Sequence, residues 1–266
     1  MNKRELEMLS LLKELKNNYG AISVKAEFEA EGTRVDELLR LVDLARRADL
    51  NVALKIGGCE AIRDLMDCQQ FGAEYVIAPM VETPYAIQKF IEAKNKVFSE
   101  DQKEHTEFLF NVETITAYEN LNNILKAASH NNGVDGIVFG RVDFAGSLGE
   151  SRDIVDSEKL NEYIYEVAKK CKSNNLDLVV GGAVSIKSIQ PLKHVNNIFL
   201  SRFETRKVIF NSEVINSNLM EKGLEKTIYF ELLWLQNKRD YYDQIKNEDS
   251  KRIEMLQSRW DQVTKR

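Results

Sequence analysis

The sequence predicts an α/β fold, a (β/α)8 TIM barrel with additional C-terminal helices, and three observations support this prediction. Short apolar runs rich in β-branched residues recur roughly every 20 to 40 residues, which is the length of one βα unit. Amphipathic helical segments separate these runs, an order typical of a parallel sheet with helices outside it. The chain has 266 residues, which suits one barrel of about 250 residues.

Seven of the apolar runs are expected to be strands buried on both faces. The turn after the first run reads KAEFEAEG and lacks the G-x-G-x-x-G pattern that a nucleotide-binding open sheet requires. Lys207–Phe210 is a candidate eighth strand; otherwise the barrel is incomplete or atypical. The seven predicted strands are Ala21–Lys25, Val52–Ile56, Tyr75–Ala78, Phe108–Asn111, Gly136–Gly140, Leu176–Val180 and Asn197–Leu200.

The pattern changes after residue 212, so we expect a barrel catalytic domain over 1–212 and a helical extension of the same unit over 213–266. Two charged helices are predicted there, over 218–240 and 247–264. The first contains an apolar cluster between Tyr229 and Leu235, which either caps the barrel bottom or forms a subunit interface. The second alternative predicts a homo-oligomer.

Composition excludes several classes of protein. A net charge of −5 argues against a nucleic-acid partner or an anionic membrane surface, because both need an excess of Lys and Arg. The three cysteines include no C-x-x-C pair, which argues against a disulfide framework or a zinc site and favours a reducing compartment. No signal peptide or run of 18 apolar residues is present, so we expect a cytoplasmic protein.

Charged residues and glycines follow nearly every predicted strand, and the active site of a barrel lies at these carboxyl ends. Carboxylates that converge there repel one another unless a cation is bound, and oxygen ligands suit Mg or Mn. His105, His130 and His194 do not follow strands, which argues against a catalytic triad or a histidine-bound zinc. The strand-end candidates are Glu27, Glu29, Lys55, Glu82, Glu113, Arg141, Asp143, Gly181, Gly182, Arg202, Glu204 and Arg206.

The two glycines have a second possible role. Gly181 and Gly182 precede Ser185, a predicted helix cap, and amides at such a position can hold a phosphate or carboxylate. A simple tight turn explains the same residues equally well.

Three segments resemble the HpcH/HpaI aldolase and citrate lyase β-subunit family: FGAEYVIAPMVETPYAI (71–87), NVET (111–114) and GVDGIVFGRVDFAGSLG (133–149). The resemblance implies a TIM barrel of the phosphoenolpyruvate/pyruvate superfamily. It also implies a divalent metal, Mg or Mn, held by Glu113 and Asp143, and a 2-oxo acid bound at that metal. Lys55 stands where the family usually places an arginine that binds the 2-oxo acid; lysine keeps the charge but loses the bidentate geometry.

The sequence departs from the family pattern at three places. Ala30 replaces the histidine that serves the aldolases as general base, so Glu29, Glu27 or Glu82 becomes the candidate proton-transfer group. Arg141 replaces a proline, and the added charge suggests an anionic second substrate such as a phosphosugar. The first strand aligns with the family's second, which leaves the closure of the barrel open.

The sequence thus predicts a metal-dependent carbon–carbon lyase or condensing enzyme that acts on pyruvate, oxaloacetate or phosphoenolpyruvate. Lys55 and Arg141 are expected to act on the substrate together with Glu29 or Glu27, while Glu82, Gly181, Gly182 and Arg202 contribute to binding. Two alternatives remain: a degenerate barrel that binds a metabolite or serves in assembly, and a metal-free phosphate-binding barrel. The prediction covers both cleavage and condensation.

Overall fold

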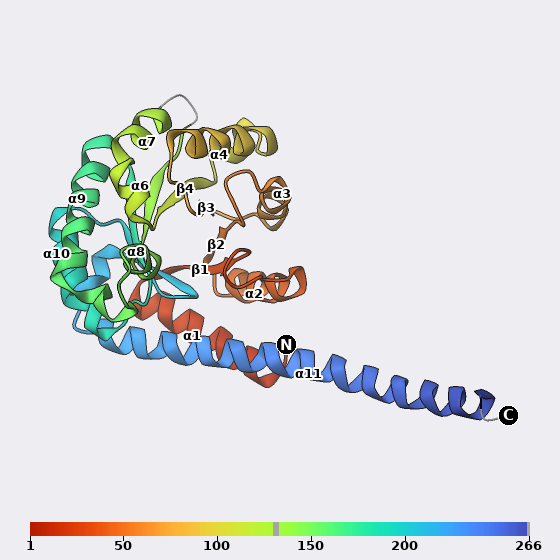
Figure 1. Cartoon of the computed structure of the whole chain (residues 1–266). Helices are drawn as coiled ribbons and strands as arrows, with labels where there is room; N and C mark the ends of the chain where they lie inside the picture. Colours follow the sequence, from red (N-terminus) through yellow and green to blue (C-terminus); the bar gives the residue numbers. More distant parts are fainter. Residues whose placement is uncertain (130–132, 265–266) are drawn as a thin grey trace.

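The computed structural model describes residues 1–129 and 133–264 and confirms the predicted barrel (Figure 1). Eight strands form a closed sheet in which each strand pairs with its neighbours in chain order, and β8 pairs with β1. The strands are β1 (Ala21–Glu27), β2 (Asn51–Lys55), β3 (Tyr75–Ala78), β4 (Glu107–Val112), β5 (Gly136–Gly140), β6 (Asp177–Gly181), β7 (Arg202–Glu204) and β8 (Val208–Asn211).

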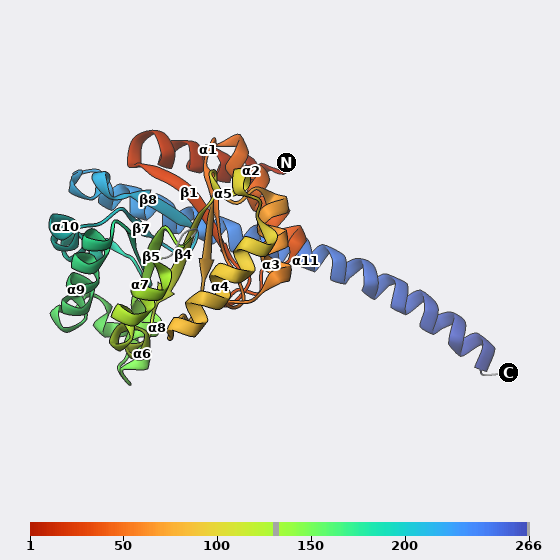
Figure 2. The same ribbon diagram turned by 90° about the horizontal axis from the view of Figure 1, so that it is seen from above.

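Helices surround the sheet, and most of them follow a strand (Figure 2). Three short 3-10 helices also occur: η1 (Arg152–Asp156), η2 (Ile186–Ser188) and η3 (Ser212–Asn216). The α-helices are α1 (Lys3–Tyr19), α2 (Val35–Arg47), α3 (Ile62–Phe71), α4 (Pro84–Val97), α5 (Glu100–Lys103), α6 (Ile115–Glu119), α7 (Leu121–Ala128), α8 (Arg141–Ser147), α9 (Glu158–Asn174), α10 (Ile189–Ile198) and α11 (Met220–Thr264).

The barrel closes through a strand that runs in the opposite direction to the others. Strands β1 to β7 are parallel, whereas β8 is antiparallel to both β7 and β1. The candidate strand Lys207–Phe210 therefore does supply the closure, as the second arm of a hairpin. The connection between β7 and β8 is consequently a short turn at the carboxyl end of the barrel, with no helix in it.

The predicted seventh strand over Asn197–Leu200 is wrong. The run NNI ends α10, and the strand begins only at Arg202. A short apolar run does not distinguish the last turn of a buried helix from a strand. The true β7 reads RFE, with a charged residue at each end, and gives no apolar signal.

Two apolar layers hold the barrel together. The inner layer fills the space enclosed by the strands, and the outer layer lies between the sheet and the helices. The barrel interior is thus a packed core. The inner layer consists of Ala53, Tyr75, Ile77, Leu109, Val138, Val179 and Ile209.

The C-terminal region forms one helix, α11, and the predicted break into two helices is wrong. Residues 241–246 read YYDQIK and contain no glycine or proline to end a helix. The first half of α11 packs along α1, with Gly223 against Tyr19. The second half extends alone beyond the barrel (Figures 1 and 2).

No helix in residues 1–129 and 133–264 combines the length and the apolar character that crossing a membrane requires. His130, one of the three histidines considered above, lies outside the described residues.

Candidate active site

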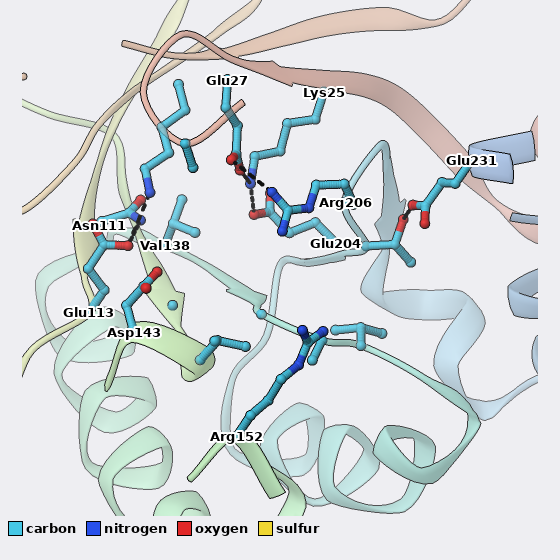
Figure 3. Close-up of a pocket in the computed structure, with 18 of the residues that line it drawn as sticks. Lys25, Glu27, Asn111, Glu113, Val138, Asp143, Arg152, Glu204, Arg206 and Glu231 are labelled. Atoms are coloured by element: carbon cyan, nitrogen blue, oxygen red, sulfur yellow. Dashed lines mark hydrogen bonds and ion pairs between the residues drawn. The ribbon is translucent and has the colours of Figure 1, made fainter. Parts of the chain in front are cut away.

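A pocket of about 270 Å³ opens at the carboxyl ends of the strands, where the barrel fold places active sites (Figure 3). Its volume is on the scale of a small metabolite. Figure 3 shows Asn111, Glu113 and Asp143 on one side and Lys25, Glu27, Glu204 and Arg206 on the other. The lining residues are Lys25, Glu27, Ala30, Lys55, Asn111, Glu113, Val138, Gly140, Val142, Asp143, Arg152, Gly182, Ala183, Val184, Glu204, Thr205, Arg206, Leu224, Ile228 and Glu231.

Glu113 follows β4 and is held in one position by three donors. Its Oε1 accepts a hydrogen bond of 2.9 Å from the backbone amide of Met80, and its Oε2 accepts one from the side-chain amide of Asn111. The ammonium of Lys55 lies 3.2 Å from Oε2. The carboxylate is 1% exposed, so these contacts fix its orientation before any ligand arrives.

Lys55 ends β2 and joins two carboxylates. Its ammonium lies 3.2 Å from Glu113 and 3.1 Å from Oε2 of Glu29. Burial lowers the pKa of Lys55, but the negative charges of Glu113 and Glu29 outweigh it, so the net shift is upward. The side chain is therefore a permanent cation at the pocket wall.

Asp143 lies in the first turn of α8, beside Glu113 (Figure 3). Among the described residues, its carboxylate has no hydrogen bond and no ion pair. Partial withdrawal from water raises the pKa of Asp143, and the charge of Glu113 raises it further. A carboxylate next to a like charge and without a partner is a position at which a cation is stabilising.

A second ionic group occupies the opposite wall. Lys25 lies 2.9 Å from Glu27 and also pairs with Glu204, while Arg206 lies 3.5 Å from Glu27. Burial lowers the pKa of Lys25, but the two carboxylates raise it well above its usual range. Burial likewise raises the pKa of Glu27, and Lys25 more than offsets this, so Glu27 stays ionised.

Two buried oxygen atoms in this pocket lack any hydrogen-bond partner among the described residues. They are Oδ1 of Asn111 and Oε2 of Glu204. Oε2 of Glu29 is a third buried oxygen without a hydrogen bond, and only its ion pair with Lys55 compensates it. Unpaired buried acceptors cost free energy, so clusters of them mark a place that a ligand completes.

The remaining wall comes from segments that are distant in the chain. Arg152 begins η1 and points into the pocket (Figure 3), and its guanidinium has no partner among the described residues. Glu231 of α11 accepts hydrogen bonds from the Thr205 hydroxyl at 2.7 Å and the Lys207 amide at 3.0 Å. These bonds attach the long helix to the β7–β8 turn.

Arg141 does not lie where the sequence suggests. Its side chain is 1% exposed and does not line the pocket. The guanidinium donates to the carbonyl of Gly181 at 3.0 Å, to Asp156 at 2.7 Å and to Ser188 at 3.2 Å. It therefore ties α8 to β6 and η1, and the prediction of a substrate cation at this position is corrected.

Arg202 is at the wrong end of the barrel for the predicted role. It begins β7, pairs with Glu107 and Asp177 at 2.7 Å each, and lies over the ring of Tyr75. Because Glu107 and Asp177 begin their own strands, this cluster closes the amino end. The sequence prediction places the seventh strand over 197–200, before Arg202, so Arg202 is expected to follow that strand, whereas it in fact begins β7.

Three other predicted residues lie at the edge of the site or outside it. Glu82 accepts a hydrogen bond of 2.7 Å from Thr114 and does not line the pocket. Gly182 lines it with a φ of +83°, and a β-carbon there would lie 2.8 Å from the amide nitrogens of Arg141 and Val142. Gly181 packs against Glu204 and does not line the pocket.

The strand-end rule does not single out Lys25, Asn111, Arg152 or Glu231. Lys25 and Asn111 do carry a signal, because Lys25 is the one charged residue in the strand run AISVK and Asn111 is the one polar residue in FLFN. Arg152 and Glu231 come from η1 and α11, where no strand end marks them.

The residues at Glu113 and Asp143 fit a hard divalent cation. They offer two carboxylates, and the amide oxygen of Asn111 lies unpaired in the same pocket. Mg²⁺ is commonly held by one or two carboxylates, with water and substrate oxygens completing the shell. No group of three or more His, Cys, Asp or Glu side chains in the described part of the chain could hold a metal by itself.

Comparison with known proteins identifies a family over most of the barrel. The model of the family described as HpcH/HpaI aldolase/citrate lyase matches residues 23–194. No curated protein sequence gives a significant match.

Several solved structures share the fold. Citrate synthase SbnG is 14% identical with a TM-score of 0.59, over 88% of this chain and 90% of that one. An HpcH/HpaI aldolase/citrate lyase family protein from Burkholderia cenocepacia J2315 is 12% identical with a TM-score of 0.58, over 91% and 90%. RipC from Yersinia pestis is 15% identical with a TM-score of 0.51, over 80% and 88%.

Proposed function

Because this chain belongs to the HpcH/HpaI aldolase/citrate lyase family, we propose that it is a metal-dependent enzyme that makes or breaks a carbon–carbon bond next to a 2-oxo acid. Pyruvate, oxaloacetate and phosphoenolpyruvate are the candidate substrates. The observation that carries the proposal is the carboxylate of Asp143, which lies beside Glu113 in the pocket without a partner among the described residues.

Glu113 and Asp143 would hold the metal, Mg or Mn. When bound, such an ion is a Lewis acid that draws electron density from a substrate carbonyl and stabilises the enolate charge. The chain's own residues prepare this position. Met80 and Asn111 orient Glu113, and the two adjacent carboxylates create the negative potential that attracts a cation.

Lys55 would hold the carboxylate of the 2-oxo acid. Its ammonium lines the pocket beside Glu113 and remains charged. A lysine binds an anion as a point charge and lacks the fork geometry of arginine, so it imposes less orientation on the acid. Glu113 would then supply part of that orientation, because it fixes the position of the ammonium.

Proton transfer would fall to a carboxylate at the end of β1, Glu27 or Glu29. Glu27 lines the pocket and Glu29 pairs with Lys55, whereas Ala30 offers no proton-transfer group. Loss of the acting carboxylate should lower kcat by about 10²–10⁴-fold. Comparing Glu27→Gln with Glu29→Gln identifies which of the two acts.

The second substrate would be anionic, and a phosphosugar is the leading candidate class. Arg141 does not contribute to this site, because its guanidinium is buried outside the pocket. Arg152 has no partner among the described residues and Arg206 has only a 3.5 Å ion pair, and both line the pocket. Two weakly compensated guanidinium groups favour a phosphate or carboxylate.

Calorimetry of Mn²⁺ binding, with and without pyruvate or oxaloacetate, tests the proposal. We expect binding that the 2-oxo acid strengthens and that Asp143→Asn weakens on the order of 100-fold, because even supporting residues around metals contribute 10–100-fold. Glu82→Gln is the matched control, since this carboxylate lies outside the pocket.

Failure to bind metal under either condition would contradict the proposal. Binding of inorganic phosphate without metal would then favour a phosphate-binding barrel, and binding of neither would favour a degenerate one. Once metal binding is established, assays in both directions with aldehyde and phosphosugar partners distinguish cleavage from condensation.

A further inference from the structure

The second half of α11 leaves large apolar side chains without cover. Ile253, Leu256, Trp260 and Val263 are between 58% and 72% exposed. The last hydrogen bond between α11 and the barrel in the described residues is made by Tyr242, which donates to Glu37 at 2.7 Å. A helix with such a face is stabilised by a partner surface.

The spacing of these residues is that of a coiled coil. Ile253, Leu256, Trp260 and Val263 follow one another at intervals of three, four and three residues, as a and d positions do. The same seven-residue frame, continued toward the barrel, reaches Leu232 and Leu235, which are 49% and 61% exposed. Between the two apolar ends, the frame contains Arg239, Tyr242, Lys246 and Asp249.

We propose that α11 pairs with α11 of a second copy of this chain as an antiparallel coiled coil. In one register, each of these a and d positions on one helix lies opposite such a position on the partner helix. Each apolar residue of the tip then lies opposite a residue of the segment near the partner's barrel, and the centre of symmetry lies between Lys246 and Asp249. The opposed pairs are Leu232 with the partner's Val263, Leu235 with the partner's Trp260, Arg239 with the partner's Leu256, Tyr242 with the partner's Ile253, and Lys246 with the partner's Asp249.

The charges at the centre of the frame support pairing with a second copy of this chain. Lys246 and Asp249 are the charged core positions nearest the centre, and the antiparallel register sets each opposite its complement on the other helix. A parallel arrangement would instead set Lys246 against Lys246 and Asp249 against Asp249. Arg239 is tolerated opposite Leu256 because its aliphatic stem packs while its head reaches water.

The register also leaves room for both barrels. Each barrel holds α11 up to Tyr242, and residues 243–252 then separate the two bodies. At 1.5 Å per residue this gives a gap of roughly 15 Å along the helix axis. The pairing therefore buries the helix tips without a collision between the barrels.

The pairing brings a second subunit to the edge of the active site. The partner's Val263 lies opposite Leu232, one turn from Ile228. Ile228 and Glu231 line the pocket. The partner's helix tip would thus cover the outer surface of the wall that α11 contributes.

Disulfide formation tests the register. The background is Cys59→Ser, because Cys68 and Cys171 are buried. We expect the Lys246→Cys/Asp249→Cys variant to form a covalent dimer under mild oxidation. Lys246→Cys alone should stay uncrosslinked, because its symmetry mate lies too far away for a disulfide. Efficient crosslinking of Lys246→Cys alone would overturn the antiparallel register.

Charge reversal tests the occupant, with molar mass from light scattering as the readout. We expect a dimer for the wild type, and Asp249→Lys should raise its dissociation constant about 10-fold by opposing two lysines. Lys246→Asp/Asp249→Lys should restore the wild-type value. Lys251→Glu, outside the predicted core positions, is the matched control.

Two results would overturn the proposal: a wild type that is monomeric at every concentration, or a Trp260→Asp variant that dimerises as tightly as the wild type. Both readouts are molar masses. They are therefore independent of whether the barrel proves to be a lyase.

Discussion

The ammonium nitrogen of Lys55 lies 3.2 Å from Oε2 of Glu113, and both side chains are almost completely buried. This pair lies between two neighbours with unsatisfied charge or hydrogen-bonding capacity, Glu29 on one side and Asp143 on the other. On this side of the barrel mouth, Lys55 thus lies among three carboxylates, those of Glu113, Glu29 and Asp143. Removing that cation has consequences that can be measured.

We expect Lys55→Met to destabilise the protein by roughly 3–5 kcal/mol, because it leaves Glu113 buried beside other carboxylates without its counter-charge. Urea unfolding at neutral pH, in the presence of a chelator, measures the loss. The double variant Lys55→Met/Glu113→Gln should recover part of it, since the uncompensated charge is gone. Equal stability of Lys55→Met and the wild type would show that Glu113 does not depend on this ammonium.

The raised pKa of Asp143 predicts a pH dependence with a definite sign. A carboxyl whose pKa is higher in the folded than in the unfolded state favours folding at low pH, and this contribution is lost as pH rises through the folded pKa. Without metal, Asp143→Asn should therefore melt at a higher temperature than the wild type at neutral pH. The difference should shrink as the solution is acidified.

Metal should reverse the order of the melting temperatures of the wild type and Asp143→Asn. Binding requires the ionised carboxylate, so Mn²⁺ should stabilise the wild type at neutral pH and lose its effect as protons compete in acid. Asp143→Asn should gain little from the ion at any pH. Melting curves with and without Mn²⁺ across this range check both statements, and a variant stabilised as strongly as the wild type would refute them.

Gly140 is expected to be required for the position of Glu113. A β-carbon at Gly140 would lie 2.9 Å from both Cβ and Oε2 of Glu113, so Gly140→Ala must displace the carboxylate. We expect metal affinity to fall by about 10–100-fold, the range for residues that orient a metal ligand. The matched control is Gly146→Ala in α8, where nothing lies within 4 Å of the added carbon. Calorimetry of both variants gives the comparison.

Replacing Arg141 should lower the stability of the protein, whereas replacing Arg206 should weaken ligand binding. Arg141→Met removes a buried guanidinium that bridges Gly181, Asp156 and Ser188, and should cost about 3 kcal/mol or more. Arg206→Met removes a half-exposed side chain, should leave stability within about 0.5 kcal/mol, and should weaken phosphate binding. A destabilised Arg206→Met with a stable Arg141→Met would contradict this assignment.

The sequence predicts most of the barrel because parallel strands buried on both faces read as continuous apolar runs. Strands β1 to β6 have this character, and the strand-end rule leads to Glu27, Lys55, Glu113 and Asp143, all of which line the pocket. The rule fails where the apolar signal fails. The three residues of β7 include two charged ones, so Arg202 is placed at the wrong end.

Arg141 shows a second limit of prediction from sequence. Its position after β5 is predicted correctly, but the direction of its side chain depends on Asp156 and Ser188, which other segments bring close. The family match ends at residue 194, so no motif describes β7, β8 or α11. These segments nevertheless supply Glu204, Arg206 and Glu231 to the pocket.

The reversed direction of β8 decides where the polypeptide leaves the barrel. A parallel last strand would release the chain at the mouth, and a following helix would have to turn back down the side. The antiparallel strand releases it at the opposite end, so α11 starts beside Tyr19, climbs past the β7–β8 turn and continues outward. The direction of β8 thus determines that the C-terminal helix runs toward the mouth and extends beyond the barrel, whereas a helix after a parallel strand would run back toward the amino end.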